Sequence, residues 1–306
     1  MEKVIITAAL TGAAHTPSMS PYLPITPDEL AEEAVKSYKA GAAVAHIHVR
    51  DPETGKPNNK IELFREVAVK VKNQCNMVLS FTTGGGFGPS DEERLRVVQE
   101  LKPELCTFNI GSMNFGIFPM GQKHDEYKFA WEKPYLDMTY DYIFPNTFKS
   151  LVKFVETMNQ NGTKPEMEIY DVGMVSSARW LIKQGLIKPP VYIQFVMGIF
   201  GGIPATVENL VFLYKTAHES IGDFVFSVAA AGKNQLQMAA TSLALKGNVR
   251  VGLEDSLFTG KGQLAKSNAE QVEKAVQLVN ALGLEVATPA DVREILGLKG
   301  LDKVNY

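Results

Sequence analysis

Short apolar segments alternate along this chain with longer segments of helical period, and this alternation constrains the fold more than any other feature. The apolar segments are rich in β-branched residues and predict eight strands, at residues 3–10, 43–49, 77–83, 105–110, 166–171, 191–197, 223–230 and 248–254. The segments between them predict helices at residues 27–41, 60–74, 91–102, 147–161, 174–185, 206–219, 235–246 and 267–282. Strand–helix pairs of about 30–40 residues are typical of βαβ units in a parallel sheet.

Eight such units favour a closed (β/α)8 TIM barrel, of class α/β, over an open doubly wound sheet. An open sheet would carry a glycine-rich fingerprint after its first strand, but residues 10–14 read Leu-Thr-Gly-Ala-Ala and lack the G-x-G-x-x-G spacing. No linker rich in Pro, Ser or Gly divides the chain, so residues 1–306 are predicted to form a single domain. The long connection at 111–146 carries many aromatic residues and predicts an ordered cover or an oligomer contact.

Charge balance and cysteine content restrict the partners of the protein. The 31 Lys and Arg residues nearly balance 34 Asp and Glu residues, which argues against nucleic-acid binding. No run of about 18 apolar residues occurs, so no membrane span is expected. The first residues run directly into a strand-like segment without the anatomy of a signal peptide. With only Cys75 and Cys106, a disulfide framework is not expected, and we expect a reducing, cytoplasmic location.

The active site of a parallel barrel is built at the carboxyl ends of its strands. Polar residues gather at the ends of the predicted strands: His46, His48, Thr82, Thr107, Asn109, Glu166, Glu168, Gln194, Arg250, Glu254 and Asp255. Charged groups within apolar strands are costly unless they are paired or bind a metal. So many of them at one end of the barrel predict a functional site.

His46 and His48 form the most specific pattern. A spacing of two along a strand places both imidazoles on one face. Two neutral imidazoles and one carboxylate form a catalytic zinc set that leaves a coordination position open. Glu254 is the predicted third ligand, because the second and eighth strands both flank the first in a closed barrel. The alternative is that the histidine pair is simply hydrogen-bonded in the core.

Arg250 and Glu254 are expected to share a strand face by alternation, with Asp255 following at the loop. An arginine buried in a strand needs a carboxylate, so Arg250 is predicted to pair with Asp255 or another acid nearby. A cation beside a carboxylate lowers the pKa of that carboxylate and keeps it available as a base. The alternative is a structural ion pair that lines the barrel.

Glycine-rich loops follow three of the predicted strands. Residues 84–88 read Gly-Gly-Gly-Phe-Gly, and their backbone amides can form a nest for a carboxylate or phosphate beside the hydroxyl of Thr82. Residues 198–202, which end at Gly202, could accept a phosphorylated cofactor, with Lys233 as the counter-charge. Ordinary βα turns are the alternative for the loop at 198–202 and for the loop at 232–234, which contains Lys233.

Six segments of the chain recur in the same order in one known family. They are ITAALTG (6–12), HIHVRD (46–51), TTGG (82–85), NIGSMNFG (109–116), PEMEIY (165–170) and RVGLED (250–255). In combination, over essentially the whole chain, they closely resemble the β-keto acid cleavage enzyme family, whose founding activity is the cleavage of 3-keto-5-aminohexanoate.

The resemblance implies a zinc-dependent barrel enzyme that condenses a β-keto acid with acetyl-CoA and releases acetoacetate and a new acyl-CoA. By the same resemblance, His46, His48 and Glu254 are expected to bind Zn²⁺, and Arg250 and Asp255 to form the acid/base dyad. The resemblance also implies a catalytic or pocket glutamate at Glu168 and substrate contacts at Thr82, Gly85 and Thr107. From their places in the chain, Asn109 and Ala14 are further expected substrate contacts, and Gly202 and Lys233 of the glycine-rich loops are the expected acetyl-CoA contacts. Members of the family tend towards tetramers, so a homo-oligomer is expected.

Two positions depart from the founding enzyme. Thr82 replaces a serine, and Ala14 replaces a glutamate that faces the ammonium group of the amino substrate. A buried ammonium without its counter-charge would be penalised by several kcal/mol, roughly. The amino compound is therefore not expected to be the natural substrate.

Two other functions agree with the same residues. Another metal-dependent barrel lyase, aldolase or hydrolase would also use a His-x-His pair, but hydrolases of that kind place the pair on the first strand and add histidines on later strands. A non-catalytic barrel that only binds a ligand would keep the pocket but has no use for the Arg250–Asp255 pair.

Overall fold

The computed structural model describes residues 3–122 and 126–306. Its centre is a closed parallel barrel with the strand order β10-β11-β12-β13-β2-β3-β6-β7. The strands are β2 (Ile6–Ala9), β3 (Val44–Ile47), β6 (Val78–Phe81), β7 (Leu105–Asn109), β10 (Lys164–Ile169), β11 (Tyr192–Met197), β12 (Val225–Ala230) and β13 (Asn248–Val251). The predicted TIM barrel is confirmed.

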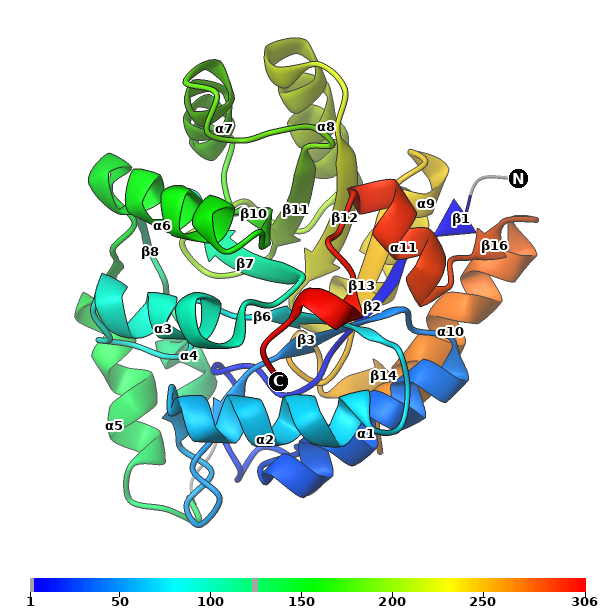
Figure 1. Cartoon of the computed structure of the whole chain (residues 1–306). Coiled ribbons are helices and arrows are strands. Elements are labelled where there is room, and N and C mark those ends of the chain that lie inside the picture. The colour runs from blue at the N-terminus through cyan, green and yellow to red at the C-terminus, as the bar shows by residue number, and fades with distance from the viewer. Residues whose placement is uncertain (1–2, 123–125) are drawn as a thin grey trace.

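The helices surround this barrel (Figure 1). They are α1 (Pro27–Ala40), α2 (Ile61–Lys72), α3 (Asp91–Leu101), α6 (Phe148–Gln160), α7 (Gly173–Lys183), α8 (Val207–Ile221), α9 (Gln235–Ala244) and α10 (Asn268–Ala281). Local signals set their ends. Thr26 Oγ1 accepts from the amide of Glu29 at 3.2 Å, and the Glu29 carboxylate accepts from the amide of Thr26 at 2.9 Å. This capping box starts α1, and Gly41 ends it in a left-handed conformation.

The amino-terminal end of the barrel is closed by a segment that the sequence pattern did not reveal. The first predicted strand divides into β2 and a short β1 (Lys3–Val4), which pairs with β16 (Glu285–Val286). The chain then forms α11 (Pro289–Leu296), whose apolar face packs against residues at the starts of the barrel strands. Arg293 of this helix forms a bidentate ion pair with Glu104 at 2.8 Å.

The connection at 111–146 contains short elements of its own: β8 (Met113–Asn114), α4 (Phe118–Gly121), α5 (Glu132–Asp137), the 3-10 helix η1 (Met138–Asp141) and β9 (Ile143–Phe144). Helix α5 is tied to two other loops at the carboxyl end of the barrel. Tyr135 donates to the carbonyl of Ala13 at 2.9 Å, and Trp131 donates to the carbonyl of Thr54 at 3.1 Å.

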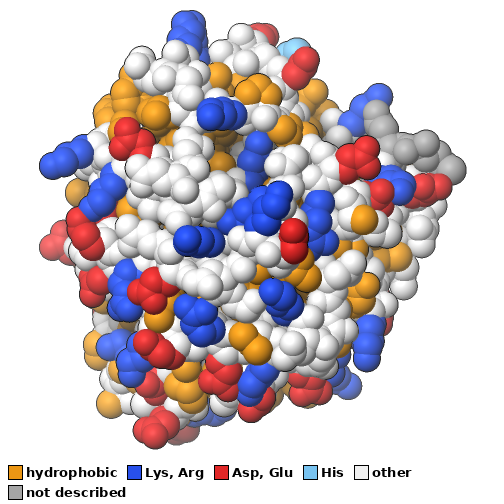
Figure 2. Space-filling model, in the orientation of Figure 1, with side chains coloured by type: hydrophobic (Ala, Val, Ile, Leu, Met, Phe, Trp, Pro, Cys, Tyr) orange, Lys and Arg blue, Asp and Glu red, His pale blue; other side chains and the backbone are white. Residues whose placement is uncertain are grey.

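Charged side chains of both signs are scattered over the face seen in Figure 2, in keeping with the nearly balanced composition. Among the described residues, no helix is both long enough and apolar enough to cross a membrane. Both cysteines are free thiols, and Cys106 is buried.

Candidate active site

Two hollows open at the carboxyl ends of the barrel strands and share part of their walls. The inner cavity, about 80 Å³, is lined by His48, Thr82, Asn109, Glu168, Arg250, Glu254 and Asp255 together with aromatic and small apolar side chains. The outer cavity is larger, about 420 Å³, and has a more apolar wall. Ala14, Glu254 and Asp255 line both. The polar strand ends thus converge where the barrel topology places them.

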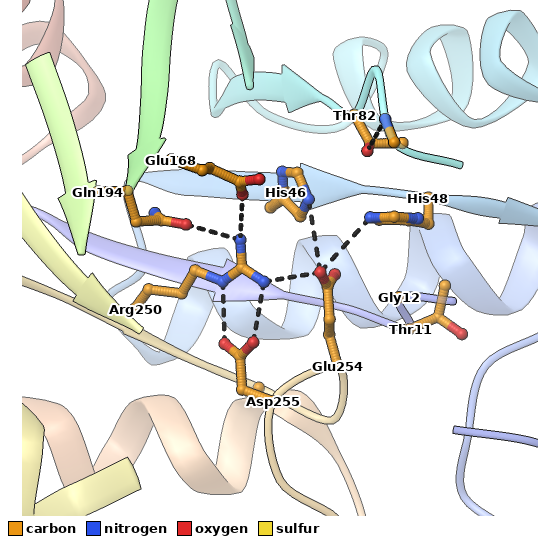
Figure 3. A network of polar contacts seen from close by, with 12 residues as sticks. Thr11, Gly12, His46, His48, Thr82, Glu168, Gln194, Arg250, Glu254 and Asp255 are labelled. Carbon is orange, nitrogen blue, oxygen red and sulfur yellow. Dashed lines mark hydrogen bonds and ion pairs between the residues drawn. The ribbon is translucent and has the colours of Figure 1, made fainter. Parts of the chain in front are cut away.

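His46, His48 and Glu254 form one compact group (Figure 3). His46 lies in β3 and His48 directly follows it, so both rings point to the same side. Glu254 Oε1 lies 3.6 Å from His46 Nε2 and 3.4 Å from His48 Nε2. Neighbouring ligand atoms of a tetrahedral zinc site lie roughly 3.3 Å apart. The spacing of these nitrogen and oxygen atoms therefore fits a metal ion.

Glu254 reaches the histidines by a route that differs from the expected one. Strand alternation does not place it beside Arg250, because β13 ends at Val251 and residues 252–255 form a turn. Gly252 begins this turn with a φ of 147°, and a Cβ there would overlap the backbone of the adjacent strand β2. A glycine turn, rather than a continued strand, therefore carries Glu254 over the barrel mouth.

The electrostatics of this group suit a cation. Burial holds the pKa of His46 well below its usual value, so the imidazole is neutral and its nitrogen can bind a metal. Burial would raise the pKa of Glu254, but the Arg250 guanidinium beside it holds that pKa well below the usual range. Glu254 Oε2 is buried and has no hydrogen-bond partner among the described residues. A buried, ionised carboxylate with an unpaired oxygen calls for a positive ligand.

Arg250 is surrounded by acceptors (Figure 3). Its Nε and Nη2 donate to the two oxygens of Asp255, both at 2.9 Å, and Nη2 also donates to Glu254 Oε1 at 2.6 Å. Its Nη1 donates to Gln194 Oε1 at 2.9 Å and lies 3.5 Å from Glu168 Oε1. The predicted pairing of Arg250 with Asp255 is confirmed as a bidentate ion pair.

The carboxyl groups beside Arg250 differ in basicity from free acids. Burial raises the pKa of Asp255 above its usual value, while Arg250 acts in the opposite direction and lowers it. Burial also raises the pKa of Glu168 to about 8, although Arg250 again acts in the opposite direction. Asp255 is consequently a stronger base than an exposed aspartate, and burial favours the protonated form of Glu168.

The structure separates the expected substrate contacts into two groups. Thr82, Asn109 and Ala14 line the inner cavity, and Asn109 Nδ2 is buried without a hydrogen-bond partner among the described residues. Gly85 lies outside that lining, against Asn59, and the hydroxyl of the buried Thr107 does not line it either.

The expected acetyl-CoA contacts lie close to the outer cavity but not in its wall. Gly202 packs against the carbonyl of Tyr170, and a Cβ there would come within 2.7 Å of that oxygen. Lys233 belongs to the 3-10 helix η2 (Gly232–Asn234), of which Gly232 lines the cavity.

Arg50 and His15 are buried or partly buried residues near the site that the sequence pattern did not single out. Arg50 is fully buried and donates to the carbonyls of Thr11, Gly12, His15 and Gly55, at 2.8–2.9 Å. It thereby fixes the loop after β2. A Cβ on Gly12, which has a φ of 58°, would overlap the Glu254 side chain. The loop that Arg50 holds is therefore the one that Glu254 packs against.

Comparison with known proteins gives matches over nearly the full length of the chain. A family model described as beta-keto acid cleavage enzyme matches residues 3–298. The 3,5-dioxohexanoate:acetyl-CoA acetone transferase of Paraburkholderia graminis is 43% identical over 305 residues, covering 99% of this chain and 98% of the relative. The 3-keto-5-aminohexanoate cleavage enzyme of Acetoanaerobium sticklandii is 41% identical over 299 residues, covering 97% and 99%.

Solved structures show the same barrel. The apo structure of ObcA matches with a TM-score of 0.75 at 20% sequence identity, over 91% of this chain and 66% of that chain. At this level of identity, the likeness concerns the fold.

Proposed function

The chain belongs to the beta-keto acid cleavage enzyme family, and from this membership we propose that it transfers the acyl group of a β-keto acid to coenzyme A. In the proposed reaction, a β-keto acid and acetyl-CoA give acetoacetate and a new acyl-CoA. The bond between the keto carbon and C2 and the bond between the acetyl carbon and sulfur break. C2 bonds to the acetyl carbon, the released sulfur of CoA bonds to the keto carbon, and the proton removed from C2 at the start returns to C2 in acetoacetate. The observation that carries the proposal is the His46–His48–Glu254 group beside the Arg250–Asp255 pair.

We propose that the metal is zinc, because two neutral imidazoles and one carboxylate are a common catalytic zinc set. His46 and His48 would bind it through Nε2, and Glu254 through its carboxylate. Zinc bound there would supply a Lewis acid that polarises the β-keto carbonyl and makes the C2 protons more acidic.

Asp255 is the proposed general base that accepts a proton from C2. It lines both cavities, so it is reached by the keto acid and by the second substrate. The bidentate contact with Arg250 holds its carboxylate in one orientation. A base in a fixed orientation removes the proton without first losing rotational freedom.

Thr82 and Asn109 are the proposed partners of the substrate carboxylate. Thr82 Oγ1 accepts from the amide of Gly84 at 2.8 Å, which leaves its own proton for a ligand. The unpaired Nδ2 of Asn109 is a second donor. A Cβ on Gly84 would lie 3.5 Å from Thr82 Oγ1 and 3.7 Å from Asn109 Oδ1, so a larger residue would occupy the space between them. The contributions of Gly85 and Thr107 stay predictions.

The apolar part of the inner cavity supports a substrate with an uncharged side chain. Ala14, Phe87, Phe115, Phe144 and Ile199 contribute apolar surface to the inner cavity. The relative from Paraburkholderia graminis is named for 3,5-dioxohexanoate, whose second keto group is uncharged. We propose that this chain takes β-keto acids of that kind, and that the larger outer cavity receives the thioester arm of acetyl-CoA, near Gly202 and Lys233.

The test is the formation of acyl-CoA from a panel of β-keto acids that carry neutral, anionic and cationic side chains. Asp255→Asn is expected to keep stoichiometric metal and lose about 1,000-fold in kcat. His46→Ala is expected to lose metal and activity together, because it removes a ligand. Asp223→Asn, a change at a fully exposed aspartate, is the matched control and should keep wild-type activity.

Three results would contradict parts of the proposal. Full activity of Asp255→Asn would contradict the proposed role of Asp255 as the general base. Unchanged turnover after complete metal removal would contradict the proposed role of a metal in the reaction. Consumption of the keto acid without acetyl-CoA would indicate a lyase or hydrolase instead.

A further inference from the structure

A buried glutamine beneath the site has no place in the mechanism above. Gln194 lies in β11 and is fully buried. Its Nε2 donates to Glu166 Oε1 at 2.8 Å and to Ser227 Oγ at 3.1 Å, while its Oε1 accepts from Arg250 Nη1 at 2.9 Å. Gln194 does not line the inner cavity, so it does not bind substrate in the proposed function. Among the described residues, Gln194 is linked to the proposed chemistry through Arg250.

The orientation of this amide is fixed by the chemistry of its neighbours. A guanidinium can only donate, so the oxygen of Gln194 must face Arg250. The Glu166 carboxylate accepts, so the nitrogen must face Glu166. A flipped amide would place oxygen against oxygen on one side and nitrogen against nitrogen on the other. Glu166 is itself held by Ser80, whose Oγ donates to Glu166 Oε2 at 2.9 Å.

Gln194 supplies the neutral contact among the acceptors around Arg250. Asp255 and Glu254 engage Nε and Nη2, and Gln194 engages Nη1 (Figure 3). If Gln194 were lost, the acceptor facing Nη1 would be Glu168 Oε1, at 3.5 Å. The planar guanidinium would then turn towards Glu168, and its two parallel bonds to Asp255 would lose their alignment.

We propose that Gln194 is a positioning residue, which fixes the guanidinium of Arg250 at Nη1 and thereby orients the Asp255 carboxylate for proton transfer. This inference rests on the proposed function of Asp255. Glu166 and Ser80 serve the same purpose one step further from the substrate, because they hold the amide of Gln194 in its orientation.

The experiment compares three substitutions of Gln194. Gln194→Leu removes the acceptor, and Gln194→Asn withdraws it by one methylene while keeping an amide, which tests the contact even if the leucine variant does not fold. Both are expected to lose about 100-fold in kcat, with the KM for each substrate within about threefold of wild type. Metal content should be unchanged, because the contacts that the structure describes for Gln194 are with Glu166, Ser227 and Arg250 and not with the three proposed metal ligands. Gln194→Glu keeps an acceptor of full length for Arg250, and a proton shared between the new carboxyl and Glu166 replaces the lost amide donor. Its kcat should therefore stay within about tenfold of wild type.

Two controls separate positioning from general damage. Ser227→Ala removes the other acceptor of the Gln194 amide but leaves the contact with Arg250, so its kcat should stay near that of wild type. The double variant Asp255→Asn/Gln194→Asn should be no slower than Asp255→Asn alone, because Gln194 acts through Asp255. A kcat near wild type in Gln194→Asn, or losses that multiply in the double variant, would overturn the inference.

The positioning role of Gln194 can still be tested if the proposed function itself fails. A wild type that forms no acyl-CoA contradicts the function but not the positioning. Crystal structures of wild type and Gln194→Asn then decide: a displaced guanidinium at Arg250 supports the inference, and an unchanged Arg250–Asp255 pair overturns it.

Discussion

At the scale of single residues, His15 links the stability of the protein to pH. His15 lines the outer cavity, and its Nδ1 contacts the carbonyl of Leu253 at 2.9 Å. Burial lowers its pKa from 6.5 to about 4. Between these two values the unfolded chain binds a proton that the folded protein does not, so the free energy of unfolding falls as the pH is lowered. The effect is absent above pH 6.5 and complete below about pH 4.

Replacing His15 should flatten this dependence. His15→Asn keeps a donor for the Leu253 carbonyl but does not titrate, so the slope between pH 6.5 and 4 should fall by up to about 1.4 kcal/mol per pH unit. Urea unfolding at a series of pH values, with chelator present throughout, measures the slope. The exposed His218 of α8 provides the control. Equal changes of slope in His15→Asn and His218→Asn would contradict the prediction.

The site residues that can be predicted from the sequence are those whose partners lie a few positions away along the chain. His46 and His48 share a face through their spacing, and Asp255 follows Arg250 closely enough to pair with it. The barrel order correctly predicts that Glu254 lies near the histidines, because β13 and β3 both flank β2. Only the strand alternation predicted for Glu254 is wrong, because the turn at Gly252 depends on close contact with a neighbouring strand. The proposed role of Gln194 could not be predicted from local sequence, since its partners come from three other strands.

At the scale of elements, a buried carboxylate fastens the 111–146 connection to the loop after β2. Glu132, at the start of α5, accepts from the amide and the hydroxyl of Ser18 at 3.0 and 2.8 Å and from the amide of Phe129 at 3.0 Å. Glu132 is fully buried. Hydrogen bonds to a charged group stabilise by about 1.5–3 kcal/mol each, and a buried donor that loses its acceptor adds a cost.

Glu132→Ala is therefore expected to destabilise this region by about 3 kcal/mol. The amides of Ser18 and Phe129 should lose protection against hydrogen exchange, and the KM for the keto acid should rise, because Ala14 of the loosened loop lines both cavities. Lys133→Ala is the matched control: Lys133 is the next residue, is exposed, and pairs with Asp137 at the surface. If both variants have the same hydrogen-exchange pattern as wild type, Glu132 does not hold the 111–146 connection to the loop after β2.

Elements with strong local signals were predictable, and those that depend on the barrel were not. Thr26 and Ser90 cap their helices as their sequences indicate. Helix α11 has only eight residues, so its apolar face has little periodicity to recognise. It is stabilised by the barrel strands that it covers, and these are brought together only by folding.

At the scale of the whole molecule, eight regular repeats were enough to predict a closed barrel, and barrel topology then brought the strand ends to one site. Contacts between subunits of an oligomer leave no comparable repeat in the sequence. Tyr140 and Ile143 of the 111–146 connection are 79% and 64% exposed, and the oligomer contact expected there stays a prediction.

Metal binding should raise the stability of the whole barrel. His46 belongs to β3, whereas Glu254 belongs to the turn after β13, and β2 lies between these strands. A metal held by both would bind the folded chain and not the unfolded one, so it shifts the folding equilibrium by mass action. At a free metal concentration of about 100 times Kd, the gain is about 2.7 kcal/mol. For a chain of this size, that corresponds to a rise in Tm of roughly 5 °C.

The measurement is thermal unfolding of metal-free protein with and without added zinc. The rise in Tm should disappear in His46→Ala, which lacks one ligand, and persist in His218→Ala, which changes an exposed histidine outside the group. A Glu254→Gln variant should also lose the rise, because its neutral amide is a poor zinc ligand. An equal rise in all of these variants would mean that zinc stabilises the protein elsewhere, and the three side chains at the barrel mouth would then have to be explained without a metal.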